Sequence, residues 1–165
     1  MFSAISEMEK KKLTIEYIEY ASMAEMPETE RAVMELAIEA TGRAYAPYSH
    51  FHVGAAVGLS DGTIVPGCNQ ENIAYPSGLC AERTALFSAG ALHPGKAVEM
   101  LAVVGRDAEG RLVEASPCGA CRQVMAEWEL RYGQKMVVLC YLGEGQIRRI
   151  EGVDKLLPFG FEAEL

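Results

Sequence analysis

Two apolar runs joined by a tight turn, followed by alternating helix-like and strand-like segments, restrict the fold of this chain most strongly. Ser60-Asp61-Gly62 separates a strand-like run at about residues 52–59 from one that ends at about Cys68, and Asp-Gly between such runs is typical of a β-hairpin. The segments that follow are expected as a helix at about 80–89, a strand at 98–104, a helix at 118–130, and strands at 135–142 and 146–150. This order predicts an α/β protein in which helices cover a sheet of about five strands.

Upstream of the hairpin, the sequence predicts one helix and one strand. Pro27 begins a helix that runs to about Gly42, with apolar residues at helical spacing. Residues 13–20, LTIEYIEY, favour a strand, although the alternation of polar and apolar residues breaks within them. A chain of 165 residues is long enough for one domain with a real hydrophobic core. We therefore expect an N-terminal arm at 1–26 and one folded domain at 27–165.

Charge and hydropathy argue against several classes of partner. The formal net charge is -8, whereas extended contact with a nucleic acid needs Lys and Arg to neutralise phosphates. The basic run Lys10-Lys11-Lys12 is followed at once by a Glu-containing segment, and we interpret it as a solvated patch. The N-terminus lacks the apolar stretch of a secretory signal, and no segment approaches the length of a transmembrane helix. We expect a cytoplasmic protein that binds neither nucleic acid nor membrane.

Three of the five cysteines lie where helices are expected to begin. Cys118 and Cys121 form a C-x-x-C pair, which in a reducing cytosol favours metal binding or redox chemistry over a structural disulfide. On a helix, residues three apart project from one face, and the positive helix N-terminus favours the thiolate, which is the form that binds zinc. With Cys80 as a third ligand, one tetrahedral position stays open for water, as in catalytic zinc sites.

The remaining thiols and the histidines do not complete this site. Cys140 stands inside an apolar run and Cys68 ends a strand, so we interpret both as buried, inert cysteines. The three histidines lack partners at ligand spacing, and we assign no catalytic role to His50, His52 or His93.

Glu82 is the candidate for acid–base catalysis. A water activated by a metal needs a neighbouring carboxylate that takes its proton and returns it to the substrate. In a regular helix Cys80 and Glu82 would lie about 200° apart, so we predict that Cys80 occupies the helix cap. Three thiolates leave the zinc site with a negative charge, which we expect Arg83 to offset by donating hydrogen bonds to sulfur. For Arg122, the same role and a plain surface position are equally open.

The two cysteine segments resemble those of the homotetrameric cytidine deaminases. CAERTA (80–85) and PCGACRQ (117–123) match the zinc-deaminase pattern of [H/C]-x-E followed by P-C-x-x-C, in its three-cysteine form. Further similarity lies in AYAPYSHFHVGAA (44–56), GCNQENIAYPSGLCAERTA (67–85) and LLPFGF (156–161). The resemblance covers about residues 30–161 and leaves the N-terminal arm outside. It implies a three-layer α/β/α sandwich with a mixed sheet of about five strands and one Zn²⁺ per subunit.

The resemblance also implies a reaction and a set of substrate contacts. The expected activity is the hydrolytic deamination of free cytidine and deoxycytidine in pyrimidine salvage, with release of ammonia. Asn69 and Glu71 match the positions that hold the ribose hydroxyls, and Phe51 matches the aromatic residue that packs near the nucleoside. Backbone groups near Ala81 would bind the amino end of the base. Phe161 matches an aromatic residue that reaches the site of a neighbouring subunit, which implies a homotetramer with shared active sites.

Several other functions remain as alternatives. A deaminase of another aminopyrimidine nucleoside, such as blasticidin, would use the same zinc site. A structural zinc module would need a fourth protein ligand and would show no turnover. A thiol redox enzyme would use Cys118 and Cys121 but would leave Cys80 and Glu82 without a purpose. The acidic charge argues against a deaminase that edits nucleic acids.

Overall fold

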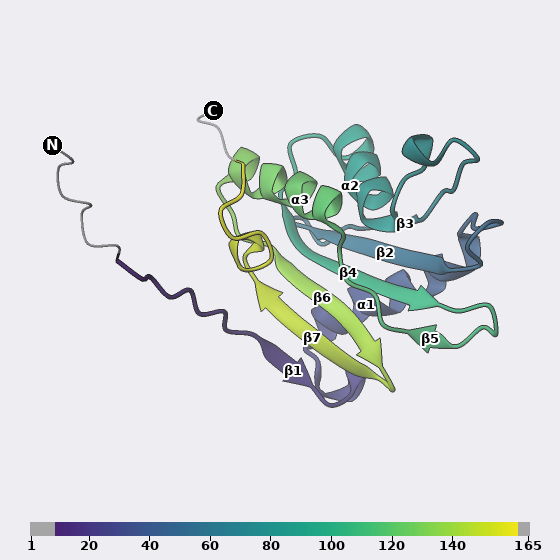
Figure 1. The fold of residues 1–165 in the computed structure, drawn as a ribbon, viewed down its shortest axis with the longest axis horizontal. Helices are drawn as coiled ribbons and strands as arrows, with labels where there is room; N and C mark the ends of the chain where they lie inside the picture. The colour runs from purple at the N-terminus through teal and green to yellow at the C-terminus, as the bar shows by residue number, and fades with distance from the viewer. Residues whose placement is uncertain (1–8, 162–165) are drawn as a thin grey trace, which may run out of the picture.

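The computed structural model describes residues 9–161, and within them three α-helices pack on a seven-stranded sheet. The helices are α1 (Glu28–Ala40), α2 (Ala81–Leu92) and α3 (Gly119–Tyr132). The strands are β1 (Ile18–Tyr20), β2 (His52–Leu59), β3 (Ile64–Cys68), β4 (Val98–Arg106), β5 (Leu112–Val113), β6 (Val137–Gly143) and β7 (Gln146–Glu151). Their order across the sheet is β1-β7-β6-β4-β2-β3, with β5 paired to β4 (Figure 1).

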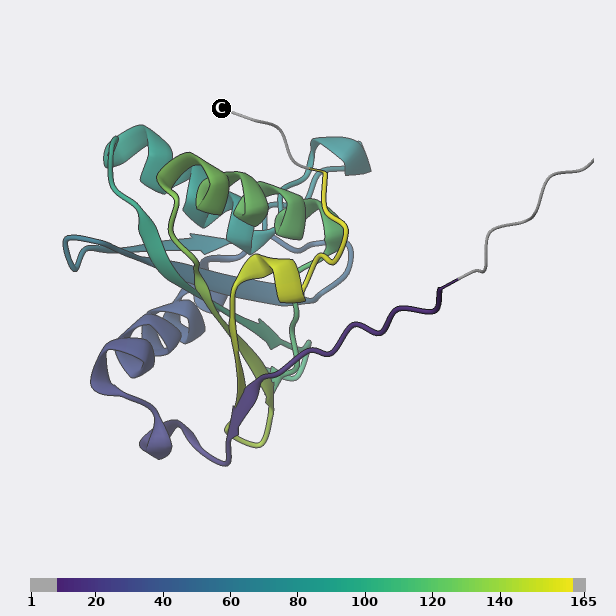
Figure 2. The same ribbon diagram turned by 90° about the vertical axis from the view of Figure 1, so that its left-hand side faces the viewer.

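The helices form layers on both faces of the sheet. α1 covers one face, while α2 and α3 lie side by side on the other (Figure 2). Two apolar cores result: Met34 of α1 packs with Leu139 in one, and Leu86 of α2 packs with Met125 and Leu101 in the other. β4 and β6 run parallel and the other neighbouring strands pair antiparallel. The expected three-layer α/β/α sandwich with a mixed sheet is therefore confirmed.

Two glycines let the helices approach the hairpin strands closely. A Cβ atom at Gly54 of β2 would collide with the backbone of α1 at Ala37, and one at Gly67 of β3 would collide with the backbone of α2 at Ala85. A strand position that lacks a side chain allows this approach. The close contact at Gly67 holds α2 over β3, and it thereby sets the position of the segment that begins α2.

The sheet has seven strands rather than the expected five because two short strands join it. β5 has two residues, which is too short for an alternating pattern to reveal. The strand expected at 13–20 pairs with β7 only over β1, Ile18–Tyr20, so the expected strand was too long at its N-terminal end. Residues 13–17 are outside any strand and exposed to solvent.

The N-terminal arm is partly built into the domain. β1 adds an antiparallel strand to β7 at one edge of the sheet, and Met26 is buried in the core beneath α1. Residues 1–8 of the expected arm, and residues 162–165 of the expected domain, lie outside the described residues. Within residues 9–161, no helix combines the length and the apolar character that crossing a membrane requires.

Candidate metal centre and substrate pocket

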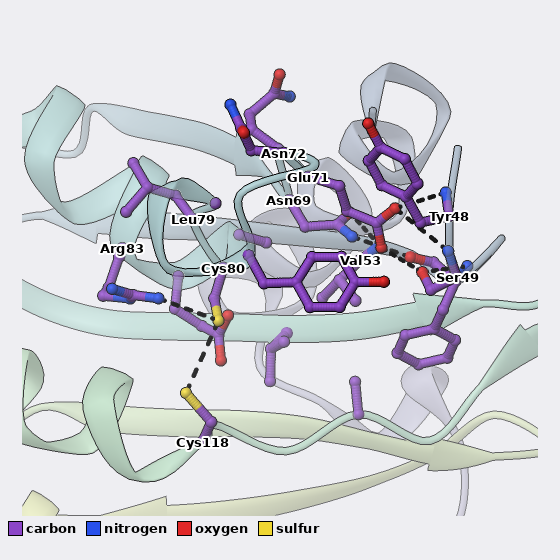
Figure 3. Close-up of a pocket in the computed structure, with 18 of the residues that line it drawn as sticks. Tyr48, Ser49, Val53, Asn69, Glu71, Asn72, Leu79, Cys80, Arg83 and Cys118 are labelled. Atoms are coloured by element: carbon purple, nitrogen blue, oxygen red, sulfur yellow. Dashed lines mark hydrogen bonds between the residues drawn. The ribbon is translucent and has the colours of Figure 1, made fainter. Parts of the chain in front are cut away.

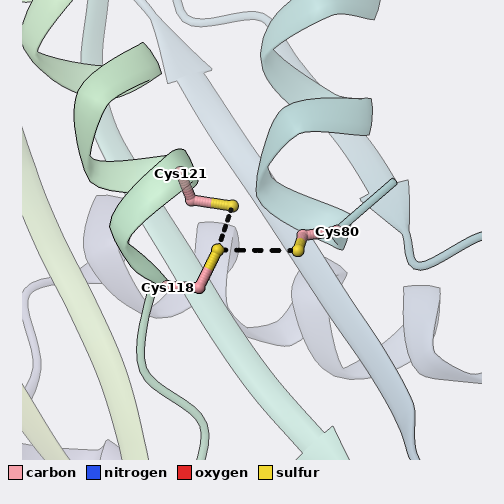
Figure 4. Close-up of side chains that lie close together, drawn as sticks. All are labelled: Cys80, Cys118 and Cys121. Atoms are coloured by element: carbon pink, nitrogen blue, oxygen red, sulfur yellow. Dashed lines mark hydrogen bonds between the residues drawn. The ribbon is translucent and has the colours of Figure 1, made fainter. Parts of the chain in front are cut away.

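Three thiols meet between the first turns of α2 and α3 (Figure 4). Cys80 is the N-cap of α2, Cys118 is the N-cap of α3, and Cys121 lies in the first turn of α3. The sulfurs of Cys80 and Cys118 are 3.7 Å apart, and those of Cys118 and Cys121 are 3.5 Å apart. Sulfurs that each lie about 2.3 Å from one tetrahedral zinc ion would be about 3.8 Å apart. The spacing and the soft donor atoms therefore fit a single zinc ion.

The fold brings these thiols together because α2 and α3 begin near the same end of the parallel strands β4 and β6. α2 leads into β4, α3 precedes β6, and these two strands are parallel neighbours. Helices that connect to parallel neighbouring strands on one face run side by side in one direction, so their N-termini meet. The backbone of Cys80 is extended (φ -70°, ψ 154°), and this places it at the cap, as the spacing to Glu82 predicted.

Cys118 differs from the expected arrangement in one respect. We expected Cys118 and Cys121 to share the face of a regular helix, but Cys118 has extended backbone (φ -68°, ψ 167°) and only Cys121 is helical. The expectation was wrong because the Cys118 backbone does not continue the helix, so Cys118 and Cys80 are both cap residues. The pair still converges, since a cap side chain can turn back toward the first turn.

Charge at the thiols is balanced by one arginine. Arg83 donates a hydrogen bond from Nη2 to the Cys80 sulfur at 3.5 Å, as expected from the sequence (Figure 3). A hydrogen bond from the Cys121 thiol, with further support from Arg83, lowers the pKa of Cys80 to about 5. The same contact raises the pKa of Cys121, because Cys80 carries the negative charge of the pair. The cluster thus favours thiolate at Cys80 even before a metal binds.

Glu82 lies beside the thiols in a nearly dry position. Only 3 % of its surface is exposed, although it lines the pocket described below. Burial raises the pKa of its carboxyl to about 7, and the negative charge at Cys80 adds to the effect. A carboxyl with a pKa near neutrality can both accept and donate a proton at physiological pH.

A pocket of about 670 Å³ opens from the thiols toward two loops (Figure 3). At its inner end lie Cys80 and Cys118, and at its outer end lie Asn69 and Glu71. Glu82 also lines the pocket, from the first turn of the helix that Cys80 caps. Of the other residues expected at the site, Phe51, Ala81 and Arg83 also line the pocket. The pocket therefore holds a candidate metal centre at one end and hydrogen-bonding side chains at the other.

The amide of Asn69 and the carboxylate of Glu71 are held by backbone groups. Asn69 Oδ1 accepts a hydrogen bond from the Val53 N–H at 2.8 Å, and Nδ2 donates to the Phe51 carbonyl at 2.9 Å. Each of these atoms keeps capacity for one more hydrogen bond. Glu71 accepts hydrogen bonds from the Tyr48 N–H at 2.9 Å, the Ser49 N–H at 3.3 Å, and the Ser49 hydroxyl.

Glu71 remains ionised in this setting. The hydrogen bond from the Ser49 hydroxyl lowers the pKa of Glu71, and the two backbone N–H groups add to the effect. An ionised carboxylate accepts hydrogen bonds and donates none. Asn69 and Glu71 together can thus accept from, and donate to, neighbouring hydroxyl groups of a ligand.

Comparison with known proteins gives the family. The family model described as the cytidine and deoxycytidylate deaminase zinc-binding region matches residues 27–139. This range includes all three thiols of the cluster and excludes the arm before Pro27. The chain belongs to this family. A family model for a zinc-binding region, together with the cluster of three thiols, supports one zinc ion per chain.

Individual relatives agree with the family model. The cytidine deaminase of Sporosarcina psychrophila is 49% identical over 127 residues, covering 76% of this chain and 86% of that protein. The cytidine deaminase of Halalkalibacterium halodurans is 43% identical over 136 residues, covering 78% and 90%. The crystal structure of cytidine deaminase from Burkholderia pseudomallei superposes with a TM-score of 0.69 at 42% identity, covering 82% of this chain and all of that chain. The predicted family and fold class are confirmed.

Phe161 lies away from the pocket of its own chain in this member of the family. Its side chain is 83% exposed, and Gln123 Nε2 donates a hydrogen bond to its carbonyl at 2.9 Å. The expected role in a neighbouring subunit's site stays a prediction. Sequence reasoning missed other lining residues, among them Tyr48 and Glu114. Tyr48 lies within a segment that carries the family resemblance, and this was the available signal.

The thiols and histidines outside the cluster fall into different environments. Cys140 is buried, as expected. Cys68 was expected to be buried, which is wrong: it is partly exposed, because its thiol sits at the end of β3 and donates to the Arg43 carbonyl. Within residues 9–161, no histidine joins a group able to hold a metal.

Arg122 takes neither of the two roles considered for it. Its Nε donates to the Pro117 carbonyl at 2.8 Å, and its Nη1 donates to the Leu156 carbonyl at 2.7 Å. Arg122 therefore ties the loop before Cys118 to the C-terminal segment.

Proposed function

We propose that this chain catalyses the hydrolytic deamination of cytidine and deoxycytidine to uridine and deoxyuridine, with release of ammonia. Family membership and the relatives named as cytidine deaminases support this reaction. The single observation that carries the proposal is the convergence of three thiols next to a pocket that Cys80, Cys118 and the buried carboxyl of Glu82 line. A pocket of about 670 Å³ falls within the range of small-molecule sites.

Cys80, Cys118 and Cys121 would hold the zinc ion, and three protein ligands leave one position for solvent. When bound, zinc supplies Lewis-acid activation of a water molecule. Arg83 offsets the negative charge of the thiolates through its hydrogen bond to Cys80. Without that offset, three thiolates would weaken the activation of water.

Glu82 carries the protons of the reaction. Its carboxylate accepts a proton from the attacking water and delivers it to ring N3, while the water oxygen bonds to C4. It then takes the second proton of that oxygen to the 4-amino group. The bond between C4 and that nitrogen breaks, ammonia leaves, and a carbonyl forms at C4. A pKa of about 7 for Glu82 suits a group that must accept and donate in one cycle.

The outer part of the pocket would hold the nucleoside. We assign the ribose hydroxyls to Asn69 and Glu71, whose free hydrogen-bonding capacity supports this role. Phe51 would pack near the nucleoside, and backbone groups near Ala81 would hold the amino end of the base. Phe161 would reach the site of a neighbouring subunit in a homotetramer with shared sites, and its exposure in its own chain supports this role.

The charges of the pocket favour an unphosphorylated substrate. Glu71, Glu82 and Glu114 line it, and Arg83, the single Lys or Arg among its described lining residues, is engaged with Cys80. A phosphate group would lack a cationic partner there. This and the net charge of -8 support a free nucleoside rather than a nucleotide or a nucleic acid. We place the reaction in pyrimidine salvage in the cytoplasm, where free thiols persist.

Metal analysis combined with a substrate panel tests the proposal. The purified protein would be assayed for zinc content and for ammonia release from cytidine, deoxycytidine, free cytosine, deoxycytidine monophosphate and blasticidin. We expect one zinc ion per chain and turnover of the first two compounds only. Turnover of blasticidin alone would reassign the substrate, and a zinc-loaded protein that releases no ammonia from any compound would overturn the proposal.

A further inference from the structure

The arm before β1 leaves the body of the protein. Residues 9–17 follow an extended path from the edge strand β1, and both ribbon views show them projecting away from the domain (Figures 1 and 2). Every residue from 9 to 17 is exposed. This segment precedes the part of the chain that the family model matches, which begins at residue 27.

The arm exposes large apolar side chains in an alternating pattern. Leu13 is 59% exposed, Ile15 is 42% exposed and Tyr17 is 54% exposed, while the intervening residues are Thr14 and Glu16. In an extended segment, alternate residues point to one side. One side of the arm is therefore apolar and about half exposed, as expected of a surface that a partner covers.

The direction of the arm is fixed at its root. β1 pairs with β7, and Glu19 accepts hydrogen bonds from the Arg148 side chain at 2.8 and 3.0 Å. The Arg148 guanidinium also lies 5.1 Å from the centre of the Tyr17 ring. An open hollow of about 560 Å³ lies between Ile15 and Tyr17 on the arm and Arg149 on the body. The arm thus does not pack back onto its own domain.

We infer that the apolar side of this arm docks onto a second copy of the same chain. Lys10, Lys11 and Lys12 stand together near the start of the described arm, whereas the whole chain carries a net charge of -8. An acidic copy of the chain complements this basic run, while the same net charge opposes binding to nucleic acids or anionic membranes.

The position of β1 also suits self-association. It is the edge strand of the sheet, and an edge strand presents backbone groups that can pair with another strand. In a two-fold dimer every contact occurs twice, so the contact that one arm makes with the second chain would be repeated by the arm of that chain. The inference adds a specific contact to the self-association proposed above, and it does not depend on the proposed chemistry.

A pair of variants tests this contact in the full-length protein. Ile15→Asp places a charge on the apolar side of the arm, and Thr14→Asp places the same charge on the neighbouring, opposite side. Neither residue lies in a strand or in the core, so both variants should fold, and circular dichroism and cytidine turnover would verify this. We expect the dissociation constant of the assembly, from sedimentation equilibrium, to rise at least tenfold for Ile15→Asp and less than twofold for Thr14→Asp.

Trypsin cleavage after Lys10, Lys11 and Lys12 gives a second readout that depends on the arm itself. Docking should slow cleavage of the wild type at least tenfold relative to Ile15→Asp, and the protection should weaken on dilution. Amine crosslinking in a mixture of ¹⁴N- and ¹⁵N-labelled protein should join a lysine of the arm in one isotope to a lysine of the other isotope.

The outcomes separate this contact from the other proposals. An assembled wild type with the same dissociation constant and cleavage rate as Ile15→Asp would overturn the arm contact alone. A monomeric wild type would overturn the contact and the proposed tetramer, whereas turnover tests the chemistry independently. Protection that does not change on dilution would show an arm folded on its own chain, and protection that requires anionic lipid vesicles would show a membrane contact; either would overturn the inference.

Discussion

The inner and outer ends of the pocket differ in how completely one chain builds them. At the inner end, the N-termini of two packed helices hold the thiols, and Glu82 is 3% exposed. At the outer end, loops provide the side chains, and Tyr75 is 76% exposed. Rigid elements give the reacting groups a fixed geometry, whereas exposed loops leave the substrate end open. The groups proposed for the chemistry can therefore be described from a single chain, while the open outer end leaves room for the neighbouring subunit that we propose.

Replacing the proton carrier at the inner end should have the largest effect. Glu82→Gln keeps the size of the side chain but cannot carry a proton, so we expect turnover of cytidine to fall by about 10²–10⁴-fold or more with zinc retained. Steady-state ammonia release and metal analysis measure this. Glu127→Gln, an exposed change on α3, is the control and should retain activity. Retained turnover in Glu82→Gln would remove Glu82 from the mechanism.

Cysteine substitutions should distinguish the thiols that bind zinc from those that do not. Cys118→Ser should lose zinc and turnover, and it should lose the stabilisation that bound zinc gives, which is about 4 kcal/mol when free zinc is 1,000 times its dissociation constant. Cys68→Ser changes a thiol outside the cluster and should keep both zinc and activity. Thermal unfolding with and without a chelator compares the two. Equal zinc content in both variants would contradict the assignment of the ligands.

The buried carboxyl should also make the stability of the metal-free protein depend on pH. Burial raises the pKa of Glu82 from its ordinary value of 4.5 to about 7, so its favourable contribution is complete below pH 4.5 and is lost as the pH rises through 7. Relative to the wild type, metal-free Glu82→Gln should therefore gain up to about 3 kcal/mol between pH 4 and pH 8. Urea unfolding at both pH values measures the difference, and a constant difference would contradict a raised pKa.

A change at the outer end should alter binding more than chemistry. Glu71→Gln removes a charged acceptor, and we expect KM for cytidine to rise by about 10–100-fold with a smaller change in kcat. A cytidine analogue that lacks the 2′ and 3′ hydroxyls should be processed equally by both proteins. If Glu71→Gln raises KM for the analogue as much as it raises KM for cytidine, Glu71 does not act through the sugar hydroxyls.

The same contrast explains what could be predicted from the sequence. Strand β2 and the cap position of Cys80 followed from local spacing, because a turn signal and a helical period each act over a few residues. The contact of Glu71 with Ser49 spans 22 residues, and that of Arg122 with Leu156 spans 34. Such contacts depend on how elements pack, which local patterns do not encode.

Short elements and chain ends were also beyond local reasoning. β5 contains two residues, and its pairing with β4 is decided by the neighbouring strand. The pattern at 13–20 predicted a longer strand than β1, because it shows which residues can be paired but not how many of them a neighbouring strand engages. Cys68 was misjudged for a similar reason, since an apolar strand does not reveal where its last side chain points.

Zinc K-edge X-ray absorption of the zinc-loaded protein tests the central claim most directly. The claim is that three sulfurs from two helix N-termini hold one metal and leave its fourth position to solvent. The spectrum should fit three sulfur atoms at about 2.3 Å and one oxygen at about 2.0 Å. Four sulfurs, or a nitrogen ligand from a protein side chain in the fourth position, would indicate a closed site and contradict the catalytic account.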